Sequence, residues 1–118
     1  MLKNFVSEKG EVGKRNLIPP TLSKDKINFV YADEADMLNV ALFGMTAKQW
    51  WEANSNTKGN IRDTATIEQL VVLSNMESIN AVLIRQVLNQ SERLKQLNKI
   101  AITQMQSLLN NKNTKKLK

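Results

Sequence analysis

The chain has 118 residues, of which 42% are hydrophobic and 24% charged, and its formal net charge at pH 7 is +6. This size allows one domain with one core, and the composition is that of an ordinary globular protein. The sequence has neither cysteine nor histidine, which removes disulfides, thiol nucleophiles and the commonest metal ligands. We therefore expect no enzyme and no cofactor.

The sequence also favours a cytoplasmic protein without a membrane partner. Its apolar runs stay below the roughly 18 residues that a transmembrane segment needs. Residues 1–10 include charged side chains, such as Lys3 and Glu8, where a signal peptide would be hydrophobic.

Residues 1–20 are predicted to form an extended N-terminal arm that ends at Pro19 and Pro20. Consecutive prolines exclude a helix there and push the preceding residue toward extended backbone. Residues 21–110 are predicted to form a single helical domain. Residues 111–118 are rich in lysine and asparagine, bury almost nothing and are expected to be a basic flexible tail.

Helix-capping residues and apolar periodicity divide the domain into about five helices. Asp33 is a predicted N-cap, Gly44 a predicted stop, and Thr46, Thr66 and Asn89 each have Gln or Glu three residues later, which is the capping-box spacing. The predicted helices are 24–31, 33–44, 46–54, 66–88 and 91–109. We expect an all-α fold in which short N-terminal helices pack on a long antiparallel hairpin, with the 66–88 helix at its centre.

Positive charge is concentrated at the C-terminal end. Residues 1–92 contain ten Lys/Arg and eleven Asp/Glu, a net charge of −1, whereas residues 93–118 contain seven Lys/Arg and no acid, a net charge of +7. Such a block is typical of a surface that binds nucleic acid or another polyanion, and a solubilising tail would show the same pattern. The candidate binding residues of this block are Arg93, Lys95, Lys99, Lys112, Lys115, Lys116 and Lys118.

Two further residues outside this block are candidates for binding. Trp50 and Trp51 point about 100° apart on a helix, so one of them should be partly exposed, and Trp51 could stack on a base or anchor a partner. Arg62 could contact an anion or form a local pair with Asp63 that fixes its loop. The acids around Asp33 are interpreted as first-turn helix residues and not as a metal site.

Six segments, in order along about ninety residues, resemble the C-terminal region of bacterial and phage KilA-N domain proteins. The longest is VYADEADMLNVALFGMTAKQW at 30–50, and the others are 16–24, 59–63, 65–81, 91–94 and 97–105. In that family the region follows an N-terminal DNA-binding domain, and we expect no counterpart of that domain in this chain. The resemblance therefore implies a phage or mobile-element origin without transferring DNA reading.

Charge and resemblance together lead to a preferred hypothesis and an alternative. The preferred one is a non-enzymatic phage- or prophage-type binding protein of the bacterial cytoplasm that acts on nucleic acid or a nucleoprotein. A sharper form is an anti-CRISPR-like inhibitor that binds an RNA-guided CRISPR effector or its guide RNA. The alternative is a homo-oligomerisation module of a KilA-N type transcription regulator, with helices 66–88 and 91–109 at the interface.

Overall fold

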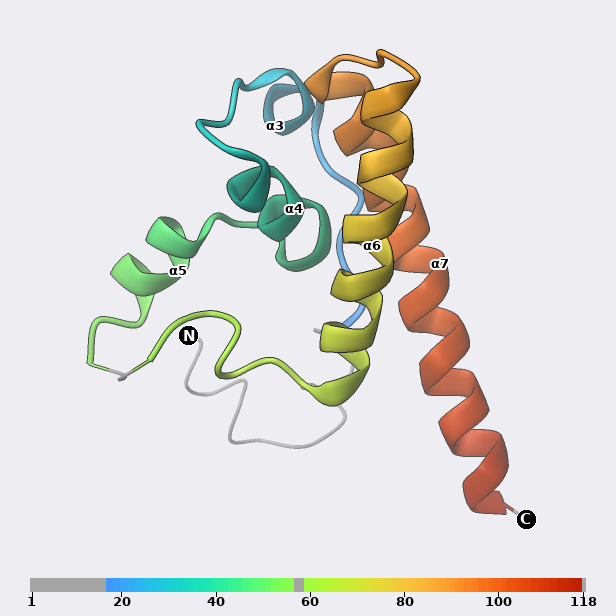
Figure 1. Cartoon of the computed structure of the whole chain (residues 1–118). Helices are drawn as coiled ribbons and strands as arrows, with labels where there is room; N and C mark the ends of the chain where they lie inside the picture. The colour runs from blue at the N-terminus through green and yellow to red at the C-terminus, as the bar shows by residue number, and fades with distance from the viewer. Residues whose placement is uncertain (1–16, 57–58, 118) are drawn as a thin grey trace.

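In a computed structural model of the chain, residues 17–56 and 59–117 are described, with side chains described as far as residue 110. The described part is all-helical, as predicted. Its helices are α3 (Lys24–Asn28), α4 (Glu34–Phe43), α5 (Ala47–Ala53), α6 (Ile67–Arg85) and α7 (Gln90–Leu117) (Figure 1).

Side-chain caps fix the start of α4, α5, α6 and α7, all four at residues that the sequence indicated. Asp33 accepts a hydrogen bond from the Asp36 N–H (2.8 Å) at the start of α4. Thr46 and Thr66 form complete capping boxes with the glutamines three residues later. At the start of α7, the Glu92 N–H donates to Asn89 Oδ1 (2.9 Å). These local bonds satisfy backbone N–H groups that a helix leaves unpaired.

The most buried helix is α4, and this corrects the prediction that residues 66–88 would be central. Six consecutive residues of α4, Met37–Leu42, are buried, and all of them except Asn39 are apolar. The core combines these residues with buried side chains of α6 and α7, among them Val72, Met76, Leu94, Leu97 and Met105. Only one side of α6 takes part in this core.

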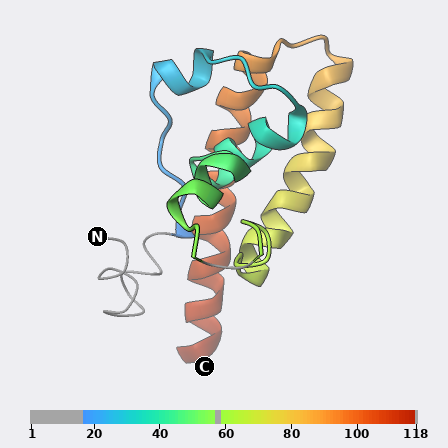
Figure 2. The same ribbon diagram turned by 90° about the vertical axis from the view of Figure 1, so that its left-hand side faces the viewer.

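The two longest helices form the predicted antiparallel hairpin. A short turn, residues 86–89, joins α6 to α7, and the two helices run side by side in opposite directions (Figures 1 and 2). Helix α4 packs against both of them, and α3 packs against α7. Helix α5 lies on the far side of α4 from α7 (Figure 1).

The first predicted helix is shorter than expected, because it ends at Asn28 and not at Tyr31. Phe29 has extended backbone, and the Tyr31 N–H donates to Gln90 Oε1 (2.8 Å) at the start of α7. The Gln90 amide in turn donates to the Tyr31 carbonyl (3.3 Å). This long-range pairing holds residues 29–31 out of the helix.

The last helix is longer than expected. It continues to Leu117, through the segment predicted to be a flexible tail. That segment has no Gly or Pro to stop a helix, and Lys and Leu are good helix formers.

Candidate polyanion-binding site

Arg93 does not belong to the basic surface that the sequence predicted. The residue is 8% exposed, and its guanidinium faces the protein interior. It donates to both carboxylate oxygens of Glu34, to Asn80 Oδ1 (2.9 Å) and to the Leu88 carbonyl (3.0 Å). We therefore assign Arg93 a structural role, because its donors are already occupied by groups of α4, α6 and the hairpin turn.

Glu34 is the acidic partner in this cluster. The hydrogen bond from Arg93 lowers the pKa of its carboxyl group, and a hydrogen bond from Asn80 (2.8 Å) acts in the same direction against the opposing effect of burial. One signal in the sequence hinted at such a partner. Arg93 is a cation in the first turn of a helix, where the helix dipole disfavours positive charge.

Lys95 and Lys99 are exposed and lie one turn apart on α7. They line a groove of about 500 Å³ between the start of α7 and the segment around α3. We call it the basic groove, and its lining residues are Thr21, Leu22, Lys24, Ile27, Asn28, Ser91, Glu92, Lys95, Asn98 and Lys99. The lining includes three lysines and one acid, Glu92, which gives it a formal charge of +2.

Lys24 is the member of this set that sequence reasoning missed. Its neighbours in the sequence are neutral on balance, with Asp25 following directly, so no charge run marks it. The residue becomes part of a basic surface only because the chain folds back against α7. No sequence signal at Lys24 itself could have shown this.

Asn98 forms the base of the basic groove and holds its two walls together. The side chain is buried (3% exposed). Its Oδ1 accepts a hydrogen bond from the Leu22 N–H (3.1 Å), and its Nδ2 donates to the carbonyls of Pro20 (3.0 Å) and Ala41 (3.1 Å). One amide thus joins α7 to α4 and to the segment that carries Lys24.

The single acid of the groove, Glu92, is partly engaged elsewhere. Its Oε2 accepts a hydrogen bond from Gln96 Nε2 (3.1 Å), one turn further along α7. The groove also offers neutral donors from Thr21 and Asn28. Lysine ammonium groups with nearby hydroxyls and amides are the groups that contact phosphates in nucleic acid complexes.

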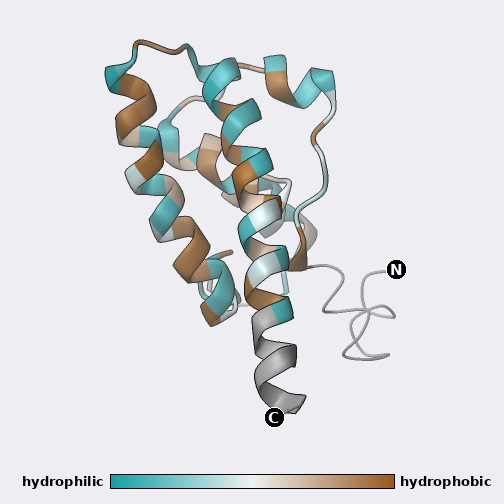
Figure 3. Cartoon of the chain, turned by 90° about the vertical axis from the view of Figure 1, so that its right-hand side faces the viewer, coloured by the Kyte–Doolittle hydropathy of each residue, from teal (hydrophilic) through white to brown (hydrophobic). Residues whose placement is uncertain are grey.

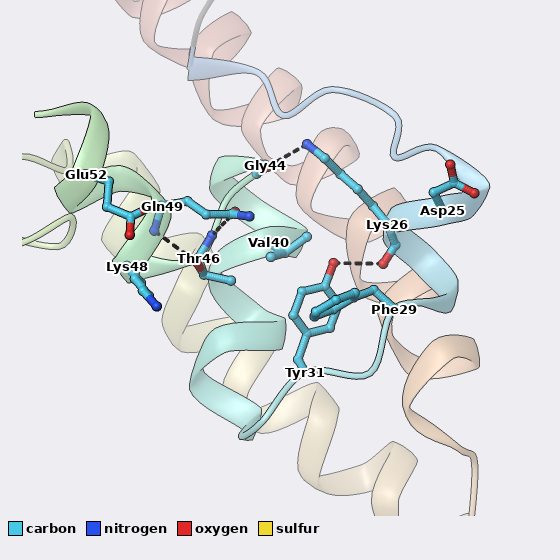
Figure 4. Close-up of a pocket in the computed structure, with 10 residues that line it drawn as sticks. All are labelled: Asp25, Lys26, Phe29, Tyr31, Val40, Gly44, Thr46, Lys48, Gln49 and Glu52. Atoms are coloured by element: carbon cyan, nitrogen blue, oxygen red, sulfur yellow. Dashed lines mark hydrogen bonds between the residues drawn. The ribbon is translucent and has the colours of Figure 1, made fainter.

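A second groove of about 510 Å³ lies between α3, the end of α4 and α5 (Figure 4). Its charged lining residues are two acids and two lysines, so it has no excess positive charge: Asp25, Glu52, Lys26 and Lys48. Two polar groups on its walls bond within the protein. Lys26 Nζ donates to the Gly44 carbonyl (2.9 Å), and the Tyr31 hydroxyl donates to the Lys26 carbonyl (2.8 Å). This groove lacks excess positive charge, and two of its donors already bond within the protein. It is therefore a weaker candidate for binding an anion than the basic groove.

Trp51 and Arg62 do not join the basic groove. Trp51 is 54% exposed on α5, in agreement with the expectation that one of the two tryptophans is partly exposed, but α5 lies across α4 from α7. Arg62 pairs with Glu77 of α6 (3.7 Å) and not with Asp63. Asp63 instead closes the loop, since its Oδ2 accepts a hydrogen bond from the Asn60 N–H (3.0 Å).

The remaining predicted residues lie at the end of α7. Lys112, Lys115 and Lys116 are in its last turns, and their side chains lie outside the described residues, as does all of Lys118. Within residues 17–56 and 59–117 no cluster of three or more acidic side chains is placed to hold a metal ion. Asp33 caps α4 instead.

One helix of the described part, α6, is long and apolar enough to cross a bilayer, with a mean hydropathy of 1.2 over eighteen residues. Core helices of soluble proteins meet the same criterion, and 33% of this stretch is buried.

Comparison of the chain with protein-family models, curated protein sequences and solved structures gave no match. The resemblance to KilA-N domain proteins therefore stays a prediction.

Proposed function

We propose that this chain is a non-enzymatic binding protein that contacts a nucleic acid, free or within a nucleoprotein, through the basic groove and the lysine-rich end of α7. The observation that carries the proposal is the meeting of Lys24, Lys95 and Lys99 around one groove at the start of the helix that holds the chain's excess charge. Phosphates are the ligands that such a surface attracts, with an affinity that falls as salt rises.

The two basic features would act together along one helix. Lys95 and Lys99 lie in the first turns of α7, and Lys112, Lys115 and Lys116 belong to its last turns. A rise of about 1.5 Å per residue separates the two groups by roughly 25 Å, a distance that a few consecutive phosphates of a nucleic acid strand span. Because such binding uses phosphates and not bases, its affinity should depend little on the nucleotide sequence.

A narrower form of the proposal rests on the resemblance alone. It makes the chain a phage- or prophage-type inhibitor that binds an RNA-guided CRISPR effector or its guide RNA in the bacterial cytoplasm. The proposed function includes no catalytic step and no cofactor.

The test is a binding titration of labelled single-stranded RNA, single-stranded DNA and duplex DNA at several salt concentrations. We expect affinity for at least one of them that weakens linearly in log salt. Lys95→Gln/Lys99→Gln should weaken binding about tenfold or more at low salt and reduce the salt slope by about two. The variant Lys26→Gln/Lys48→Gln is the matched control, because it removes the same charge from the second groove and should bind normally.

Neutralising Lys112, Lys115, Lys116 and Lys118 separates the contribution of the helix end from that of the groove. Equal binding by all three variants and the unmodified chain would contradict the proposal, as would the absence of any salt-dependent binding. Pull-down from a bacterial lysate that contains an RNA-guided effector tests the narrower form.

A further inference from the structure

Helix α6 turns an apolar side to solvent. Ile67 is 76% exposed, Leu70 41%, Val71 46% and Val82 50%, and all four belong to α6. Apolar segments recur along α6 (Figure 3). Single exposed apolar residues are ordinary, but an apolar side along a 19-residue helix indicates a binding surface.

Six of the exposed positions of α6 follow a seven-residue repeat. Residues at alternating spacings of four and three are all exposed: Ile67, Val71, Ser74, Ser78, Ala81 and Arg85. This spacing keeps side chains in one seam facing a neighbouring helix, as in coiled coils. The partner that fits the seam is therefore another helix, and we refer to these six residues, with Leu70 and Val82 beside them, as the α6 seam.

The α6 seam is complementary to itself when two copies run antiparallel. A two-fold axis at its middle sets Ser74 against Ser78 of the second copy. It also sets Val71 against Ala81, so that a larger side chain meets a smaller one. Small central residues allow the two helix backbones to approach closely, and the apolar residues toward the ends provide the contact area.

Charge favours the same direction of pairing. Arg85 is in the last turn of α6. An antiparallel pair keeps the two Arg85 side chains at opposite ends of the interface and opposes the two helix dipoles. A parallel pair would place Arg85 against Arg85, which costs energy by like-charge repulsion.

We propose that the α6 seam is a two-fold antiparallel interface between two copies of this chain. The inference does not depend on nucleic acid binding, because Lys24, Lys95 and Lys99 lie outside the α6 seam. A dimer would present two basic grooves on one particle. A seam of one helix pair is at the low end of interface size, so the dimer should form reversibly and depend on concentration.

Sedimentation velocity of the full chain from about 5 to 500 µM tests the interface, with a monomer–dimer equilibrium as the expected result. Val71→Glu should raise the dissociation constant at least about 30-fold, because it buries a charge in the α6 seam. Val30→Glu is the matched control, since Val30 is 81% exposed in the loop before α4 and should leave the equilibrium unchanged. Far-UV circular dichroism verifies that both variants are folded.

Cysteine cross-linking tests the direction of pairing, because the chain has no cysteine of its own. A mixture of Val71→Cys and Ala81→Cys chains should form a mixed disulfide much faster than either variant forms a disulfide with itself. Rapid self-linking of Val71→Cys would overturn the antiparallel arrangement. A chain that stays monomeric at about 500 µM would overturn the dimer. Flotation with phosphatidylcholine/phosphatidylglycerol vesicles tests membrane binding instead. The proposal would also be overturned if the chain were a monomer that bound these vesicles and Val71→Glu abolished the binding.

Discussion

Arg93 in the first turn of α7 is paired with Glu34 in the first turn of α4, with Arg93 Nη2 3.2 Å from Glu34 Oε2. The Arg93 side chain is 10% exposed, whereas that of Glu34 is 45% exposed. The pair therefore lies at the edge of the core, with the cation buried and the acid half in solvent. It links α4 to α7, and Asn80 of α6 completes the cluster.

Arg93→Met should lower the free energy of unfolding by about 2–3 kcal/mol, because it leaves Asn80 Oδ1 and the Leu88 carbonyl without a donor. The half-exposed Glu34 can return to water, which keeps the loss below that of a fully buried pair. Urea denaturation followed by circular dichroism measures the change. Lys95→Met is the matched control on the same helix and should shift stability by no more than about 0.5 kcal/mol. Equal losses in the two variants would refute the structural role of Arg93.

Acid stability should depend on Glu34. Its pKa is lowered below the ordinary value of 4.5 in the folded protein, mainly by the hydrogen bond from Arg93. The carboxylate therefore contributes stability that is complete above pH 4.5 and is lost as the pH falls through the lower, folded-state pKa. Urea midpoints between pH 7 and pH 3 should decline less steeply in Glu34→Gln than in the unmodified chain. Glu52→Gln, an acid exposed on α5, should keep the original slope.

Local signals made most of the fold predictable. The caps at Asp33, Thr46 and Thr66 act within three or four residues, so the sequence displays them directly. The width of the apolar stripe on α6 was also visible. Which half of that stripe is covered depends on the placement of α4, and this is a tertiary property that periodicity does not contain.

The candidate site was predictable only in part, because its contacts join distant segments. Counting charge selected Lys95 and Lys99, and both are exposed on α7. The same count included Arg93, whose partners in α4 and α6 no local pattern reveals. It omitted Lys24, which reaches α7 through the hydrogen bonds of Asn98.

Asn98→Ala should lower the free energy of unfolding by about 2–4 kcal/mol. The change leaves the Leu22 N–H and the Pro20 and Ala41 carbonyls without their partner, and Asn98 is buried. Chemical denaturation measures the loss. Asn75→Ala is the matched control. It removes an exposed amide whose Nδ2 donates to Gln104 Oε1 (3.0 Å) and should cost about 0.5 kcal/mol or less.

The same variant tests how the basic groove is held together. If Asn98 fixes the segment of Lys24 against α7, Asn98→Ala should weaken nucleic acid binding at temperatures where it is still folded. Binding that is unchanged in a folded Asn98→Ala chain would show that Lys24 does not need this connection.

Val87, in the turn between α6 and α7, should be the easiest place to stabilise the chain. Its φ of 63° is the one left-handed backbone among the non-glycine residues that the structure describes, and β-branched side chains disfavour this conformation. The side chain is 88% exposed, so it gives little contact energy in return. Asparagine tolerates the left-handed region, and Val87→Asn should raise the free energy of unfolding by about 1 kcal/mol. Val30→Asn is the matched control, because Val30 is similarly exposed but has ordinary backbone, and it should give no gain. A loss of stability in Val87→Asn would mean that this valine makes an apolar contact worth more than the backbone strain.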